Sequence, residues 1–362
     1  MEHRADQLFD QQYSNLINAK RLTDDEFIGL YHSLDLVSLG GLANLVRQQK
    51  HDHKIVTYVI DRNINYTDIC ISACKFCAFY KGPEHTQGSV LSKDELLEKI
   101  DQTKALGGTQ ILLQGGLHPD LPLSFYETMV RDIKRTGMHL HGFSPPEICH
   151  FASISGFSID KVLDRLIEAG LDSIPGGGAE ILCDRVRTLT APNKCSADQW
   201  IAVMEMAHKK GLRTTATMMF GHVETIEERL EHLRRLRELQ DKTGGFTAFI
   251  PWPFQSDNTP LRTEETNQKF RTTGYEYLRM LALSRIYLDN FDNIQASWVT
   301  QGPKVAQLSL MFGANDFGST MIEENVVAAA GVSFLLSEDE IKRLIEDAGM
   351  IPRQRRMDYS LI

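Results

Sequence analysis

Cysteine is scarce in this sequence, with six residues among 362. A chain of this length that relied on disulfide bonds would carry many more, so we expect reduced thiols and a fold held by its hydrophobic core. No apolar run approaches the roughly 18 residues that a membrane-spanning helix requires. The first residues also lack the apolar segment of a secretory signal. These absences predict a cytoplasmic protein that makes no membrane contact.

An excess of basic residues is also lacking. The chain has 39 Lys and Arg against 48 Asp and Glu, a formal net charge of −9. General nucleic-acid binding requires clustered basic side chains, so we expect no nucleic-acid partner. No proline-rich linker or low-complexity run divides the chain. We therefore predict one barrel over residues 55–320, preceded by a helical extension over 1–54 and closed by a helix and tail over 321–362.

Strand and helix signals alternate along the central part of the chain. Runs rich in β-branched and apolar residues predict eight strands, the last of them weak: 55–60, 110–113, 138–143, 171–174, 213–218, 246–250, 293–297 and 310–314. Glycines typical of helix C-termini recur at about the length of one βα unit: Gly107, Gly137, Gly170, Gly211 and Gly244. This alternation predicts an α/β fold, a TIM-type (β/α)₈ barrel, with a doubly wound open sheet as the alternative.

Polar and glycine-rich segments follow the predicted strands one after another. They are Cys70–Cys77, Gln114–Gly116, Ser144–Glu147, Gly176–Glu180, Gly221–Glu224 and Trp252–Gln255. Active sites of such barrels lie at the C-terminal ends of the strands. We therefore expect these six segments to surround one active site.

The first of these segments has the spacing C-x₃-C-x₂-C, formed by Cys70, Cys74 and Cys77. Three thiolates on a short loop are suited to an iron–sulfur cluster, and a [4Fe–4S] cluster needs four ligands. The other cysteines are isolated in sequence: Cys149, Cys183 and Cys195. A structural zinc site would require four ligands, and three cysteines that merely pack are the remaining alternative. The spacing favours a cluster with one iron open to an outside ligand.

With Phe76 before its third cysteine, this loop resembles the signature of the radical S-adenosylmethionine (SAM) enzymes. The resemblance implies that a reduced [4Fe–4S] cluster binds SAM through its open iron and cleaves it to a 5′-deoxyadenosyl radical. It also implies a flavodoxin- or ferredoxin-like electron donor. The alternative from another class is a non-catalytic iron–sulfur electron-transfer protein, which would usually close its cluster with four cysteines.

Other segments resemble the SAM-binding motifs of the same family. Gln114–Gly116 stands where the family binds the methionine amino group, although the expected acidic residue is absent. Glu180 resembles the ribose-binding residue after the fourth strand, and the segment 217–224 resembles the support of the adenine. Each motif has a structural alternative. Gln114–Gly116 could be a plain tight turn, the glycine run before Glu180 could be a strained connection, and Glu224 could place a favourable charge at a helix N-terminus. The resulting cofactor-binding prediction comprises Phe76, Gln114, Gly115, Gly116, Ser144, Glu180, Gly221 and Glu224.

Longer stretches resemble the dehypoxanthine futalosine cyclases of menaquinone biosynthesis. The matching stretches are 141–148, 172–182, 215–225, 243–252 and 351–355. The resemblance implies hydrogen abstraction from C4′ of the ribose of dehypoxanthine futalosine, ring closure onto the aryl group, and loss of an electron and a proton. Aminofutalosine synthases and deazaflavin (F₀) synthases share the cysteine loop and remain alternatives.

This chemistry calls for further residues. We predict Asp316 and His222 as proton acceptors, with an ordinary loop aspartate as the alternative for the first. A substrate carboxylate favours a bidentate arginine, for which the candidates are Arg285, Arg353 and Arg355. The candidates for ribose hydroxyls are Ser144, Glu147 and Gln255, and those for a dry aryl wall are Trp252 and Phe254.

Overall fold

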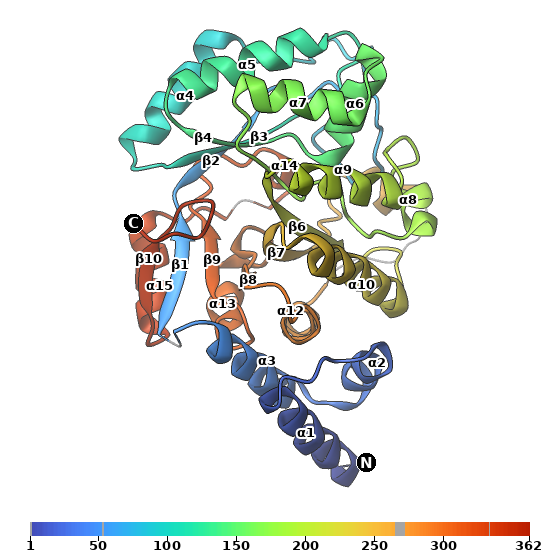
Figure 1. Ribbon diagram of the computed structural model, residues 1–362, viewed down its shortest axis with the longest axis vertical. Coiled ribbons are helices and arrows are strands. Elements are labelled where there is room, and N and C mark those ends of the chain that lie inside the picture. Colours follow the sequence, from blue (N-terminus) through green and yellow to red (C-terminus); the bar gives the residue numbers. More distant parts are fainter. Residues whose placement is uncertain (1, 53, 265–271, 333) are drawn as a thin grey trace.

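The computed structural model describes residues 2–52, 54–264, 272–332 and 334–362 (Figure 1). Its helices are α1 (Glu2–Ile17), α2 (Asp24–Ser33), α3 (Leu36–Lys50), α4 (Lys93–Ala105), α5 (Leu123–Arg135), α6 (Pro145–Ser155), α7 (Ile159–Ala169), α8 (Asp184–Thr190), α9 (Ala197–Lys209), α10 (Ile226–Thr243), α11 (Pro260–Glu264), α12 (Gly274–Tyr287), α13 (Trp298–Ser309), α14 (Val326–Ala329) and α15 (Glu338–Asp347). Its strands are β1 (Ile55–Val59), β2 (Asp61–Asn65), β3 (Gln110–Gln114), β4 (His139–Gly142), β5 (Ser173–Ile174), β6 (Arg213–Phe220), β7 (Phe246–Pro253), β8 (Asn293–Ile294), β9 (Asp316–Ser319) and β10 (Ile351–Gln354).

The strands form a parallel barrel in sequence order. Seven strands, β2 to β8, each pair with the next one along the chain. β1 leads directly into β2 and pairs with β9 on one side and β10 on the other. An isolated parallel bridge joins Gln295 to Asp316 and so connects the β8 end of the sheet to β9. The predicted barrel is confirmed, and the doubly wound alternative fails because the strand order never reverses.

The helices cover the outside of this barrel, and α1 to α3 extend from one end of it (Figure 1). Four of the glycines at helix ends show how the chain turns from helix to strand. Gly107, Gly137, Gly170 and Gly211 have φ between 81° and 118°, a left-handed conformation that side chains with a Cβ disfavour. Each turn returns the chain to the next parallel strand.

The predicted eighth strand is misplaced. Residues 310–314 are the end of α13 and the turn after it, where Gly313 has φ of 103°. Leu310 and Ala314 are fully buried, and a short apolar run of this kind does not distinguish a buried helix end from a strand. The strand is β9, which begins at Asp316. Asp316 therefore lies within the eighth strand of the barrel rather than after it.

The interior of the barrel is polar along its first two strands. Alternate side chains face inward, and those lining the interior are Val59, Asp61, Asn63, Gln110, Leu112 and Gln114. The intervening residues Ile64, Ile111 and Leu113 are fully buried on the other face, beneath the helices. No helix among the described residues is long and apolar enough to cross a membrane. The interior of the barrel is therefore a cavity large enough for a small ligand, and not a packed apolar core.

Candidate active site

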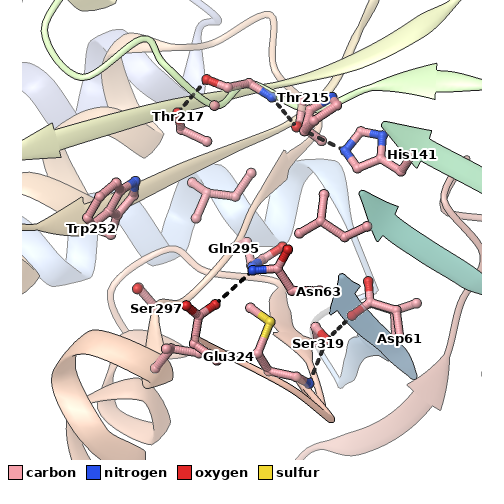
Figure 2. Close-up of a pocket in the computed structure, with 18 of the residues that line it drawn as sticks. Asp61, Asn63, His141, Thr215, Thr217, Trp252, Gln295, Ser297, Ser319 and Glu324 are labelled. Carbon is pink, nitrogen blue, oxygen red and sulfur yellow. Dashed lines mark hydrogen bonds between the residues drawn. The ribbon is translucent and has the colours of Figure 1, made fainter. Parts of the chain in front are cut away.

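A cavity of about 270 Å³ lies inside the barrel (Figure 2). Of the residues predicted to bind the cofactor, Gln114 and Glu180 line it, and so does the glycine run at Gly176–Gly178. Thr217 donates a hydrogen bond to the Gly176 carbonyl (2.6 Å), and the Gly176 N–H donates to Thr215 (2.9 Å). Hydrogen bonds from β6 thus fix the glycine run against the cavity.

The cysteine loop follows β2 and is held by backbone contacts. The N–H groups of Ser72 and Leu117 donate to the Cys70 sulfur at 3.4 and 3.3 Å. The Ser72 hydroxyl lies 3.1 Å from the Cys74 sulfur. Hydrogen bonds to the sulfurs are among the contacts by which proteins tune iron–sulfur clusters. The donors around these thiols therefore fit the group that the family signature implies.

Burial raises the pKa of the Cys74 thiol to about 11 and also raises that of Cys77. These thiols therefore need a bound cation to become thiolates near neutral pH. Among the described residues, no three His, Cys, Asp or Glu side chains converge on a single ion position. A cubane cluster does not need such convergence, because each thiolate binds a different iron. The donor set fits a cluster better than one zinc ion.

The segment Gly115–Gly116 lies directly against this loop. A Cβ on Gly116 would come within 2.1 Å of the Ile69 carbonyl oxygen, and a Cβ on Gly115 within 2.5 Å of the Tyr66 ring. The Glu147 carboxylate accepts from the Gly115 N–H (3.1 Å) and from the Tyr66 hydroxyl (2.7 Å). Both positions therefore require glycine for the close packing of this segment against Tyr66 and Ile69, independently of any contact with a ligand.

We expect Gly116→Ala to displace the cysteine loop, because its new methyl group has no space beside Ile69. The variant should retain much less iron and sulfide than the unmodified protein after anaerobic reconstitution. Gly41→Ala in α3 is the matched control, because a Cβ there meets nothing within 4 Å. Equal iron content in both variants would contradict this account of Gly116.

Ser144 begins α6, where it forms a capping box with Glu147. Its N–H and hydroxyl both donate to one oxygen of that carboxylate, at 2.7 and 2.6 Å. Burial raises the pKa of Glu147, whose other oxygen holds Gly115 and Tyr66. Both oxygens of Glu147 are therefore engaged within the protein. Glu147 therefore holds Ser144 and Gly115 in place, although neither residue lines the cavity.

A half-buried lysine connects Glu180 to the cysteine loop. Lys194 Nζ lies 2.9 Å from Glu180 Oε1 and 4.9 Å from the centre of the Phe76 ring. Burial would lower the pKa of Lys194, but the charges of Cys74 and Glu180 raise it overall. Lys194 therefore remains protonated beside the Glu180 carboxylate. The sequence pattern did not single out this residue, because it stands outside every motif, in the connection between α8 and α9.

His232 supports the segment that follows Glu180. Its Nδ1 accepts the N–H of Leu182 (3.0 Å). Burial lowers the pKa of His232 to about 3, whereas an unfolded chain has a histidine pKa of about 6.5. As the pH falls below about 6.5, the unfolded chain binds a proton that the folded protein excludes, so stability is lost.

We expect this histidine to remove about 2 kcal/mol from the free energy of unfolding when the pH falls from 7 to 5. Urea unfolding at both pH values measures the total loss of stability, which should be about 2 kcal/mol smaller in His232→Gln, because the other buried histidines still contribute. The exposed His32 in α2 provides the control His32→Gln, which should keep the full pH dependence. The same loss in His232→Gln as in the unmodified protein would contradict this assignment.

The segment Gly221–Glu224 folds around its own carboxylate. Glu224 accepts from the N–H groups of Gly221 (2.6 Å) and His222 (2.9 Å), and from Arg229 (2.8 Å). Burial favours its neutral acid form, but His222 and Arg229 lower the pKa of Glu224 overall. The α10 N-cap is Thr225 rather than Glu224. Glu224 therefore holds the turn at the end of β6.

The two predicted proton acceptors are already hydrogen-bonded within the protein, and neither lines the cavity. His222 lies with Nε2 3.0 Å from the Met219 carbonyl and Nδ1 3.1 Å from Glu224. Asp316 is fully buried and accepts two hydrogen bonds from Arg355, at 2.5 and 3.0 Å. These contacts do not favour proton acceptance from a ligand by either side chain.

The three candidate arginines have different surroundings. Arg285 is fully buried outside the cavity and donates to backbone carbonyls, including that of Gly313 (2.7 Å). Arg353 is exposed on β10. Arg355 lines the cavity but is paired with Asp316. Among the described residues that line the cavity, Arg355 is the only Lys or Arg.

The aromatic candidates divide in a similar way. Trp252 lines the cavity (Figure 2). Phe254 packs instead in a small apolar cluster with Met219 and Leu261, against which Phe76 rests. The Gln255 side chain donates to the Pro253 carbonyl (2.9 Å). Phe76 thus lies between the Lys194 ammonium and an apolar support.

Comparison with known proteins agrees with this arrangement. The sequence matches the radical SAM superfamily over residues 64–236 and the "CofH/MqnC C-terminal region" over 243–362. It is 45% identical to a cyclic dehypoxanthine futalosine synthase of Halalkalibacterium halodurans, over 96% of this chain and 93% of that protein. It is 44% identical to a 5-amino-6-(D-ribitylamino)uracil–L-tyrosine 4-hydroxyphenyl transferase of Methanosarcina barkeri, over 84% and 81%. It is 42% identical to an aminodeoxyfutalosine synthase of Thermus thermophilus, over 95% and 93%.

Solved structures share the fold. Methylornithine synthase (PylB) superposes with a TM-score of 0.70 at 18% identity, covering 94% of this chain and 97% of its own. The hydrogenase maturase HydG gives a TM-score of 0.73 at 14% identity, covering 98% of this chain and 76% of its own. Family membership implies a [4Fe–4S] cluster and SAM. The chain belongs to the radical SAM superfamily and carries the C-terminal region of its CofH/MqnC branch.

Proposed function

We propose that this protein is a radical SAM cyclase that converts dehypoxanthine futalosine to its cyclic form in menaquinone biosynthesis. The observation that carries the proposal is the 45% identity to a cyclic dehypoxanthine futalosine synthase over nearly the whole of both chains. The cavity in the barrel supports it, because it offers space for a small substrate and is lined by two of the predicted cofactor-binding residues, Gln114 and Glu180. Aminodeoxyfutalosine synthase is the second candidate, favoured by a relative of that name at 42% identity.

Cys70, Cys74 and Cys77 would hold the cluster, leaving one iron for SAM. When bound, these groups supply a carbon radical that abstracts hydrogen from C4′ of the substrate ribose. Glu180 is the proposed partner of the SAM ribose, and Lys194 holds its carboxylate in place at 2.9 Å. Gln114, Gly115 and Gly116 would line the methionine end, and Gly221 and Glu224 would shape the adenine end.

The remaining work of the protein is positioning and exclusion of water. Radical addition to the aryl ring requires the two carbons to be held about 3–3.5 Å apart. Trp252 on β7 provides a flat apolar surface for the aryl group, while Asp61 and Asn63 of β2 face it across the cavity (Figure 2). Asp316 and His222 would act by positioning their neighbours. The electron would come from a flavodoxin- or ferredoxin-like donor.

Product identification tests the proposal. The reduced, reconstituted protein is incubated with SAM and either dehypoxanthine futalosine or an enolpyruvyl-benzoate substrate. We expect 5′-deoxyadenosine and a product two hydrogens lighter than dehypoxanthine futalosine, detected by mass spectrometry. A nucleoside adduct formed from the enolpyruvyl compound would instead assign the protein to the second candidate.

A further inference from the structure

One wall of the cavity presents hydrogen-bond acceptors that have no donors. Asn63 of β2 lines the cavity and is only 6% exposed. Its Nδ2 donates to Glu324 Oε2 at 3.1 Å (Figure 2). Because an ionised carboxylate oxygen can only accept, this contact fixes the orientation of the amide. The Asn63 Oδ1 is consequently left buried without a hydrogen-bond partner.

Gln110 of β3 repeats this arrangement on the neighbouring strand. It lines the cavity, is 4% exposed, and donates from Nε2 to Asp61 at 2.7 Å. Its Oε1 has no hydrogen-bond partner. Asp61 pairs with Gln110 in the strand register, and Asn63 lies two residues further along β2. The two unpartnered carbonyl oxygens thus lie on adjacent strands, one inward position apart.

Glu324 completes the wall from the segment after β9. Its Oε1 accepts the N–H groups of Val326 and Val327 at 2.7 and 2.8 Å, so the carboxylate is held rigidly at the cavity. Buried acceptors without donors are destabilising and uncommon in folded proteins. A molecule that enters the cavity can supply the missing donors. A small molecule with several neutral hydroxyl groups could donate hydrogen bonds to these acceptors at the same time.

We propose that Asn63, Gln110 and Glu324 form the subsite that binds the hydroxyl groups of the substrate's sugar. This inference rests on the proposed function for the identity of that sugar, the ribose of dehypoxanthine futalosine. The subsite makes these three residues determinants of substrate specificity, because a deoxy analogue leaves the same buried acceptors without donors. A sugar held at this wall lies across the cavity from Trp252 (Figure 2).

The test measures binding without turnover. The reconstituted holoenzyme with SAM, but without reductant, is titrated calorimetrically with dehypoxanthine futalosine and with its 2′-deoxy and 3′-deoxy analogues. We expect Asn63→Ala to raise the Kd for the full substrate about tenfold. At least one deoxy analogue should bind the unmodified protein about tenfold more weakly, and should bind Asn63→Ala and the unmodified protein equally. If Asn63→Ala does not fold, Gln110→Ala carries the same comparison.

Asn18→Ala is the control, since the exposed Asn18 side chain donates to the Ser14 carbonyl just after α1 and does not line the cavity, and its Kd should be unchanged. Equal Kd values for full and deoxy substrates in the unmodified protein would overturn the subsite. So would Mg²⁺ or Ca²⁺ alone binding to the unmodified protein and not to Asn63→Ala, which would mark a cation site. Failure of the proposed function is distinguishable, because it appears as absence of cyclised product after reduction, whatever the Kd values.

Discussion

Cys74→Ala should contain only background iron and sulfide after reconstitution and should form no detectable 5′-deoxyadenosine. The thiol is 5% exposed and lies beside Ser72, within the loop that also carries Cys70 and Cys77. With three protein thiolates, a cubane cluster keeps one iron for SAM. Removing one thiolate leaves only two protein ligands, and the site that binds SAM is lost with the cluster.

The other cysteines provide matched controls for this variant. Cys149→Ala and Cys183→Ala remove thiols that lie outside the loop, on α6 and at the N-cap of α8. Both should keep the iron and sulfide content of the unmodified protein. In the reduced state, the electron paramagnetic resonance signal of these controls should shift when SAM is added. A full, SAM-responsive cluster in Cys74→Ala would refute the ligand assignment.

Arg355→Ala should lower the free energy of unfolding by about 3–5 kcal/mol, the usual cost of leaving one member of a buried ion pair alone. Arg355 and Asp316 are almost fully buried and joined by two hydrogen bonds, and Thr57 donates a third to the same carboxylate at 2.5 Å. The pair joins β10 to β9 and β1, where the barrel closes. Chemical unfolding in urea measures the loss.

Arg353→Ala is the control, because that side chain is exposed two residues away on β10, and its effect should stay within about 0.5 kcal/mol. The double variant Asp316→Leu/Arg355→Met should lose less stability than the two single variants together, because no charge is then left buried.

Asp316→Ala separates this structural role from proton acceptance. A variant as stable as the unmodified protein that still forms 5′-deoxyadenosine without cyclised product would favour Asp316 as the base.

The sequence predicted the barrel and its cysteine loop well because both depend on local patterns. Gly107 and Gly170 mark helix ends through a backbone conformation that few other residues adopt. The spacing of the three cysteines is a property of one short loop. The eighth strand was misplaced because an apolar run at the end of α13 looks like a strand when only its composition is read.

The cavity wall formed by Asn63, Gln110 and Glu324 was not predicted, for a related reason. The predicted first strand stopped at residue 60, because β2 continues with Asp61, Asn63 and Asn65, which are poor strand formers. Only Ile64 among the five residues of β2 is apolar, so the sequence lacks the alternation that marks a half-buried strand. Nothing local connects Asn63 with Glu324, which is brought to it by the closure of the barrel. Lys194 was overlooked in the same way, because its contact with Glu180 depends on the folding of the α8–α9 connection.

The most direct test of the central claim uses dehypoxanthine futalosine carrying deuterium at C4′. The reduced holoenzyme is given SAM and this substrate, and the 5′-deoxyadenosine formed is analysed by mass spectrometry alongside the product. The account predicts one deuterium transferred to 5′-deoxyadenosine and a cyclised product without deuterium at that carbon. Unlabelled 5′-deoxyadenosine together with a product that keeps its deuterium would contradict hydrogen abstraction at C4′.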